Sequence, residues 1–134
     1  LVITEEPFPN CPLYTVHVRH KHEYRIHVFK GQIIDMVEKR KRDGFLDRNP
    51  WIRSYNNGYV FCRNELVVPE VVKLEAIKAT AALGLDFGAV DIAYRKKENV
   101  AYVLEVNTAP GIEGQTINSY VNAIQKEMMN NVQN

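Results

Sequence analysis

Two pairs of alternating, strand-like segments are each joined by a connection too short to cross over a sheet. In the first pair, residues 23–29 and 32–41 are separated by a Lys-Gly dipeptide. In the second pair, residues 86–94 and 100–107 are separated by a charged tip. Parallel neighbours need a crossover of about a dozen residues or more, so both pairs are predicted to be antiparallel hairpins.

The other segments complete an α+β pattern. Residues 13–18 alternate and predict a further strand, and residues 59–63 predict a short one. Helical spacing of apolar residues predicts helices from Pro69 to Gly84 and over residues 116–130. The predicted fold class is α+β: a largely antiparallel sheet with helices packed on one face. The apolar stripe of the last helix is expected to face the core.

Composition excludes several classes of protein. The 134 residues carry 17 Lys plus Arg against 16 Asp plus Glu, and a formal charge of +1 argues against a generic nucleic-acid or membrane-surface binder. No apolar run approaches the roughly 20 residues of a membrane span, and no signal peptide is visible. The two cysteines have no metal or redox spacing, which favours a cytoplasmic protein.

Carboxylate and amide side chains meet on the last predicted hairpin. Glu105 and Asn107 are two residues apart and therefore point to the same face of one strand. Asp91 on the partner strand is expected opposite residue 104 or 105. Two adjacent carboxylates need a compensating cation, and an all-oxygen ligand set favours Mg²⁺ or Mn²⁺. The alternative is an ordinary hairpin whose polar side faces water.

Four basic residues support phosphoryl chemistry in the same domain. Arg25 lies in the middle of a predicted strand, Lys39 and Arg40 lie near the end of the next, and Arg53 lies in the turn-rich loop 42–58. Phosphoryl transfer needs such donors around the phosphates and the developing charge. The run of basic residues 39–42 is also compatible with a solvated face or a nucleic-acid patch.

These residues resemble the C-terminal half of an ATP-grasp domain, over roughly residues 1–130. The resemblance rests on Glu23-Tyr-Arg-Ile-His-Val-Phe29, on Lys39-Arg40, and on Leu83-Gly-Leu-Asp-Phe-Gly-Ala-Val-Asp91 followed by Val103-Leu-Glu-Val-Asn-Thr-Ala-Pro-Gly111. It is strongest to phage-encoded ATP-grasp proteins and ribosomal-protein glutamate ligases, which would place the protein in a host cytoplasm if it is phage-encoded.

The resemblance implies ATP and two Mg²⁺ ions, an acyl phosphate made from a carboxylate, and an amine or thiol that attacks it. By that resemblance Asp91, Glu105 and Asn107 are metal ligands. Basic positions near the phosphates and the substrate correspond to Arg25, Lys39, Arg40 and Arg53. Nucleotide contacts are implied for Tyr14, Val16, Val18 and Leu104.

ATP-grasp domains also use a glycine-rich loop and lysines from an N-terminal lobe, and this sequence begins with Leu1 rather than Met. Residues 1–134 are therefore expected to be the C-terminal portion of such a domain, in a fragment that is inactive alone.

Two rival functions remain open at the level of sequence. A metal-dependent nuclease also uses Asp and Glu on neighbouring strands, but it usually has Lys where this chain has Asn107. A single-stranded nucleic-acid binder would use the basic run 39–42 with stacking faces from Trp51, Tyr55 and Tyr59.

Overall fold

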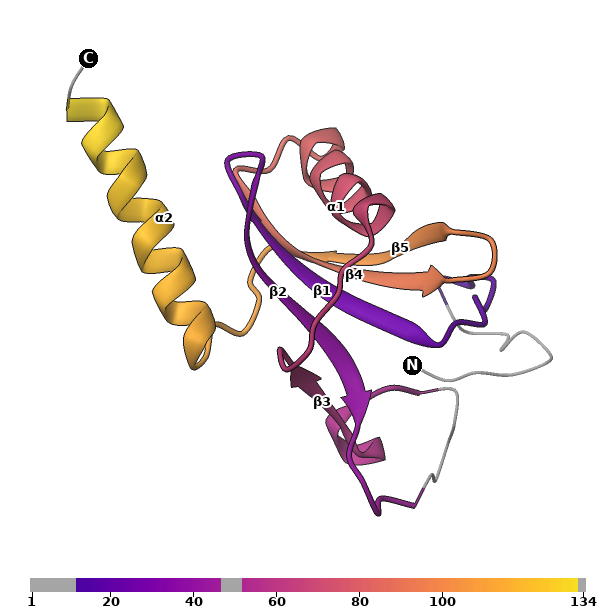
Figure 1. Ribbon diagram of the computed structural model, residues 1–134. Coiled ribbons are helices and arrows are strands. Elements are labelled where there is room, and N and C mark those ends of the chain that lie inside the picture. The colour runs from indigo at the N-terminus through magenta and orange to yellow at the C-terminus, as the bar shows by residue number, and fades with distance from the viewer. Residues whose placement is uncertain (1–11, 47–51, 133–134) are drawn as a thin grey trace.

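The computed structural model describes residues 12–46 and 52–132 (Figure 1). Its strands are β1 (His22–Phe29), β2 (Gln32–Lys41), β3 (Tyr59–Cys62), β4 (Phe87–Arg95) and β5 (Val100–Asn107). Its helices are the 3-10 turn η1 (Tyr55–Asn57), α1 (Glu70–Ala82) and α2 (Gln115–Val132). Among these described residues, no helix is both long and apolar enough to cross a membrane.

The strands form one sheet in the order β3-β2-β1-β4-β5, and every neighbouring pair is antiparallel. The predicted α+β class and both predicted hairpins are confirmed. The first hairpin turns at Lys30 and Gly31, whose φ angles are +49° and +72°. Positive φ at both turn residues is the type I′ geometry, which matches the twist of the flanking strands and is easiest for glycine.

One face of the sheet is apolar and is covered by α1. Alternate residues of β1, among them Ile26 and Val28, pack with Val90 of β4 against Val72 and Ala76 of α1. The intervening residues point to the opposite face. We call that opposite face, which carries Arg25 and His27 of β1 with their cross-strand partners, the polar face.

Helix α2 departs from the expectation that both helices pack on one face. That expectation holds for α1, whereas α2 meets the polar face, where the Tyr120 hydroxyl lies 3.1 Å from Nδ1 of His27. Figure 1 shows the rest of α2 extending away from the sheet.

The predicted burial of the apolar stripe of α2 is therefore wrong for most of its length. Only Thr116 and Tyr120 of this helix are buried, while Ile117, Val121 and Ile124 are 43–47% exposed and Met128 is 63% exposed. Helical periodicity predicts an apolar face, but it does not predict which surface covers that face.

The predicted strand over residues 13–18 is also wrong, because this segment has no regular structure. A strand needs a hydrogen-bonded neighbour. No described strand pairs with the segment, and the sheet ends at β3 and β5. The alternation of apolar residues predicted a strand, but the described part of the chain contains no neighbouring strand that pairs with it.

Candidate functional site

The three predicted metal ligands share the polar face. Asp91 of β4 is paired directly with Glu105 of β5, and Ala89 is paired with Asn107. The register shifts beyond Asp91, where Ile92 pairs with Val103 and Leu104 is left without a partner. Such a bulge re-aims side chains locally and is common beside active sites.

Arg25 continues this row of side chains across the sheet. It is the cross-strand partner of Asp91, and its Nε and Nη2 atoms donate to the two carboxylate oxygens at 2.7 and 2.8 Å. The hydrogen bonds to Asp91 raise the pKa of Arg25, which therefore stays charged. On its other side the guanidinium carbon lies 4.6 Å from the centre of the Phe61 ring of β3.

Glu105 and Asn107 differ in how far they are already engaged. The amide oxygen of Asn107 accepts the N–H of Ala109 at 2.9 Å. Glu105 is exposed, and among the described residues no hydrogen-bond partner is found for its carboxylate. A cation at this position would thus meet one open carboxylate, one amide oxygen, and an Asp91 that it has to share with Arg25.

This donor set fits a hard cation that keeps water or phosphate among its ligands. The donors are oxygens, as Mg²⁺ and Mn²⁺ prefer. The described residues contain no group of three or more His, Cys, Asp or Glu side chains arranged to hold a metal by themselves. The set of two carboxylates and one amide is thus suited to a metal that arrives with its own ligands, such as a metal–nucleotide complex.

A third carboxylate, Glu23, contacts three nitrogen-bearing side chains. Its Oε1 accepts a hydrogen bond from Lys39 Nζ, and its Oε2 lies 3.2 Å from His20 Nε2 and 3.9 Å from Arg53 Nε. Burial raises the pKa of Glu23, but the His20 hydrogen bond and the charge and hydrogen bond of Lys39 outweigh it, so the net pKa is lowered. Glu23 is therefore a buried carboxylate that stays ionised.

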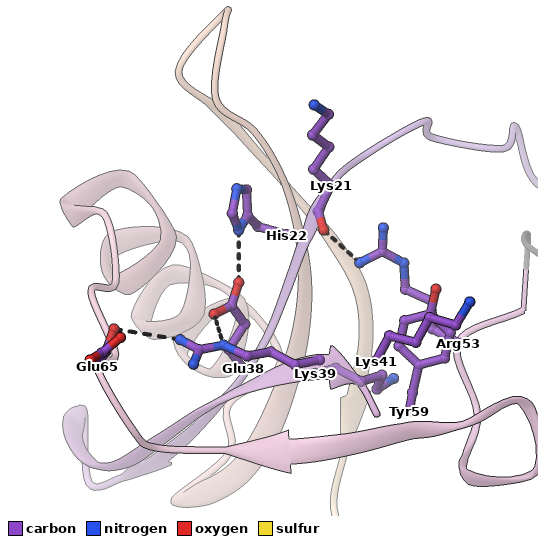
Figure 2. A pocket seen from close by; sticks show the side chains of 9 residues that line it. Lys21, His22, Glu38, Lys39, Lys41, Arg53, Tyr59 and Glu65 are labelled. Carbon is purple, nitrogen blue, oxygen red and sulfur yellow. Dashed lines mark hydrogen bonds and ion pairs between the residues drawn. The ribbon is translucent and has the colours of Figure 1, made fainter. Parts of the chain in front are cut away.

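Three of the predicted basic residues line one pocket of about 510 Å³, beside the end of β2 (Figure 2). Five of its nine lining residues are cationic: Lys21, Lys39, Arg40, Lys41 and Arg53. The other four are His22, Glu38, Tyr59 and Glu65. The pocket is thus a basic hollow at the end of β2, and none of the predicted metal ligands lines it.

Two of the cationic side chains in this pocket, Arg40 and Arg53, already donate hydrogen bonds within the protein. Arg40 turns to the side of the sheet opposite Lys39, where its Nε donates to Glu38 at 2.6 Å and its Nη1 to the Asn64 carbonyl at 2.7 Å. Arg53 donates to the carbonyls of His20 and Lys21 at 2.6 and 2.8 Å. The structure therefore groups Arg25 and Lys39 on the polar face and uses Arg40 and Arg53 to tie segments together.

Sequence reasoning missed a buried polar cluster where α2 begins. Asp35 of β2 accepts from Arg63 Nη2 at 2.5 Å and from the Thr116 hydroxyl at 2.6 Å. Burial raises the pKa of Asp35, but the bonds from Arg63 and Thr116 outweigh it and lower the net pKa. The available signal was the polar residue Asp35 in an otherwise apolar part of a predicted strand.

The residues predicted to contact the nucleotide come from two separate segments of the chain. Tyr14, Val16 and Val18 lie in the irregular segment before β1, where Val16 is 90% exposed. Leu104 is the bulged residue of β5 and is 46% exposed. The described residues thus supply one open sheet face and no enclosed cleft of these four side chains.

The basic run 39–42 is divided between the two sides of β2. Lys39 and Arg40 point to opposite sides of β2 and pair with Glu23 and Glu38 respectively. Trp51, one of the proposed stacking residues, lies outside the described residues.

Comparison with known proteins agrees with this geometry. Residues 15–132 match the model of the RimK-like ATP-grasp domain. No curated protein matches the chain.

Solved structures with a similar fold include the D-alanine–D-alanine ligase of Bacillus anthracis, at 23% identity and a TM-score of 0.51. The same ligase complexed with ATP gives 22% identity and a TM-score of 0.54. In both cases 72% of this chain and 31% of the ligase are covered. The macrocyclase MdnC of Microcystis aeruginosa MRC, bound with precursor peptide MdnA, gives 19% identity and a TM-score of 0.46 over 70% of this chain and 27% of its own.

The likeness to the ligases from Bacillus anthracis shows a shared fold, and this chain spans about a third of their length. The match to the family model, in contrast, covers nearly all of residues 1–134. The chain therefore belongs to the RimK-like ATP-grasp domain family.

Proposed function

We propose that this chain carries the metal- and phosphate-binding face of an ATP-dependent ligase that joins a carboxylate to an amine. The observation that carries the proposal is the row of Arg25, Asp91 and Glu105 on three neighbouring strands, with Asn107 on the same face. Membership of the ATP-grasp family supports the use of ATP.

The residues divide into two roles. Asp91, Glu105 and Asn107 would hold Mg²⁺, which supplies positive charge to the nucleotide phosphates when it is bound. Arg25 and Lys39 would donate hydrogen bonds to the phosphate oxygens and stabilise the charge that develops on the transferred phosphoryl group. Arg25 can take this role without leaving Asp91, because a guanidinium has five N–H donors and Asp91 accepts from only two of its nitrogens.

The proposed reaction has two steps. A substrate carboxylate oxygen attacks the γ-phosphorus of ATP, and ADP leaves, so that an acyl phosphate forms. An amine then attacks the acyl carbon, inorganic phosphate leaves, and the nitrogen loses a proton to give the amide. A thiol in place of the amine would give a thioester by the same sequence.

We expect that residues other than those described here supply a second wall for the nucleotide. The polar face is open, and the ligases with a similar fold are about three times as long as the matched part. Nucleotide contacts from Tyr14, Val16, Val18 and Leu104 belong to the same proposal, because each of the four side chains would need that second wall to enclose a base.

An NMR titration of the chain with ADP and Mg²⁺ tests the proposal. We expect amide shifts at Arg25, Asp91 and Glu105, and we expect Glu105→Gln to abolish them. Glu98→Gln is the matched control, because Glu98 is an exposed carboxylate of the same hairpin that pairs with Arg95 instead. Shifts confined to other parts of the chain, or equal shifts in the Glu105→Gln variant, would contradict the proposal.

A further inference from the structure

Glu23 is a buried carboxylate that is not among the proposed metal ligands. It is 6% exposed, and nitrogen atoms from three separate segments surround its carboxylate: His20 before β1, Lys39 on β2 and Arg53 in the loop before η1. A carboxylate with so little access to water needs such partners to remain ionised. Its position on β1, two residues from Arg25, places this cluster on the polar face.

The two partners Lys39 and Arg53 are themselves well shielded. Their side chains are 16% and 15% exposed, and the ends of the Arg53 guanidinium are occupied by two backbone carbonyls. These two hydrogen bonds tie the Arg53 side chain to the backbone of the segment before β1. Lys39 is the partner of Glu23 whose charged end also contacts the ring of Phe61.

Lys39 and Arg25 both contact the aromatic ring of Phe61. Lys39 Nζ lies 5.7 Å and the Arg25 guanidinium carbon 4.6 Å from the centre of the Phe61 ring. Each of these two cations has its own carboxylate, Glu23 for Lys39 and Asp91 for Arg25. In the proposed function Asp91 is also a metal ligand. Glu23, in contrast, pairs with Lys39 whether or not a metal is bound.

We propose that Glu23 is a positioning residue that fixes Lys39 next to Arg25, so that the two cations form a ready-made site for a polyphosphate. The inference rests on the proposed function, because it assigns a phosphate to the polar face. It goes beyond that function in assigning the pre-organisation of the site to a carboxylate, a group that by its own charge repels phosphate.

The chain offers a matched control in Glu38. This carboxylate is 8% exposed, is paired with His22 and Arg40, and points to the opposite side of the sheet. Glu23 and Glu38 thus have similar burial and similar kinds of partner. A general effect of removing a buried, paired carboxylate should appear in both variants, and an effect on the polar face should appear only at Glu23.

The sign of the effect separates positioning from simple electrostatics. Replacing Glu23 by neutral Gln removes a negative charge near the site, and that alone should tighten binding of an anion. If Glu23 positions Lys39, binding should instead weaken, because the released ammonium becomes mobile. A loss of one well-placed charge-assisted hydrogen bond corresponds to a weakening of about tenfold.

The experiment is a titration of the chain with sodium tripolyphosphate, without added metal, followed by NMR at a temperature where each variant is folded. Glu23→Gln is expected to weaken binding about tenfold, and Glu38→Gln is expected to stay within about twofold of the wild type. In the Lys39→Gln background, Glu23→Gln should cause no further weakening, because the side chain that it positions is gone.

Tripolyphosphate binding that is unchanged or tighter in Glu23→Gln would overturn the inference, and so would an equal loss of binding in Glu38→Gln. Neither result would affect the proposed function, which the titration with ADP and Mg²⁺ tests separately. Failure of the wild type to bind tripolyphosphate would also overturn it. If Glu23→Gln does not fold, Glu23→Asp replaces it, because Asp keeps the negative charge on a side chain that is one methylene shorter. The affinity of Glu23→Asp for tripolyphosphate is expected to lie between those of the wild type and Lys39→Gln. An affinity equal to that of the wild type would overturn the inference.

Discussion

At the scale of single residues, Arg25 and Asp91 make the best-defined contact of the candidate site. Both side chains are mostly buried, with 19% and 11% exposed, and they form two parallel hydrogen bonds. Removing one partner of such a pair leaves the other charge with poor solvation. The pair is thus a stabilising contact of the fold as well as part of the proposed site.

We expect Arg25→Ala to lower the free energy of unfolding by about 2–3 kcal/mol, because Asp91 is then left without its cation next to Glu105. Urea denaturation measures this loss. Mg²⁺ should raise the melting temperature more in Arg25→Ala than in the wild type, because a cation can replace the missing guanidinium. An equal effect of Mg²⁺ on both proteins would argue against a metal at Asp91 and Glu105.

His27 makes stability depend on pH at this same face. Burial lowers the pKa of His27 from its ordinary value of 6.5, and the positive charges of Arg25 and Arg63 lower it further, while Asp35 opposes them. The unfolded chain therefore takes up a proton at higher pH than the folded chain does. The contribution of His27 to stability is complete above pH 6.5 and is lost as the pH falls through the lowered folded pKa.

We accordingly expect the free energy of unfolding to fall as the pH is lowered below 6.5, and we expect His27→Gln to reduce that slope. Chemical denaturation at a series of pH values measures it. A slope that is the same in both proteins would show that His27 does not titrate differently in the folded and unfolded states.

At the scale of secondary-structure elements, α2 is fixed at its beginning and uncovered along the rest. Tyr120 packs edge-on against His27 and Phe87, and Thr116 bonds to Asp35. The apolar residues one and two turns further along the helix remain exposed. Side chains on one helix therefore differ sharply in what they contribute to stability.

We expect Tyr120→Ala to cost about 3 kcal/mol of unfolding free energy, as other truncations of buried aromatic residues do. The changes Val121→Ser and Ile124→Ser should each cost no more than about 0.5 kcal/mol, because both side chains are already exposed. Urea denaturation of the three variants decides the matter. Comparable losses at all three positions would mean that the stripe is buried in solution.

Elements defined by local signals were predictable from the sequence. The hairpin turn at Lys30 and Gly31, the strand alternation on both sides of it and the helix after Pro69 depend on neighbouring residues. The placement of residues 13–18 and of α2 depends on which surfaces lie nearby, and a periodic pattern does not specify a partner.

The same distinction applies to the candidate site. The spacing of Glu105 and Asn107 predicted a shared face, and a short hairpin tip predicted Asp91 across from it. The Leu104 bulge and the pairing of Glu23 with Lys39 and Arg53 depend on contacts between segments that are distant in the sequence, so no local pattern predicts them.

At the scale of the whole molecule, the described residues form a core on one side of the sheet and an open polar face on the other. We expect the chain of residues 1–134 to melt in one cooperative transition and to show no ATP turnover, because one open face does not enclose a nucleotide. Calorimetry and phosphate release measure the two properties. Robust ATP hydrolysis by the chain alone would contradict this view of the polar face.

A divalent cation is expected to bind between β4 and β5 on the polar face, and paramagnetic broadening by Mn²⁺ tests this binding most directly. Substoichiometric Mn²⁺ added to the ¹⁵N-labelled chain should broaden amide signals of residues 89–91 and 105–107 first. Glu105→Gln should remove that selectivity, and the control Glu98→Gln should preserve it. Broadening that is centred elsewhere, or that survives unchanged in Glu105→Gln, would contradict the account.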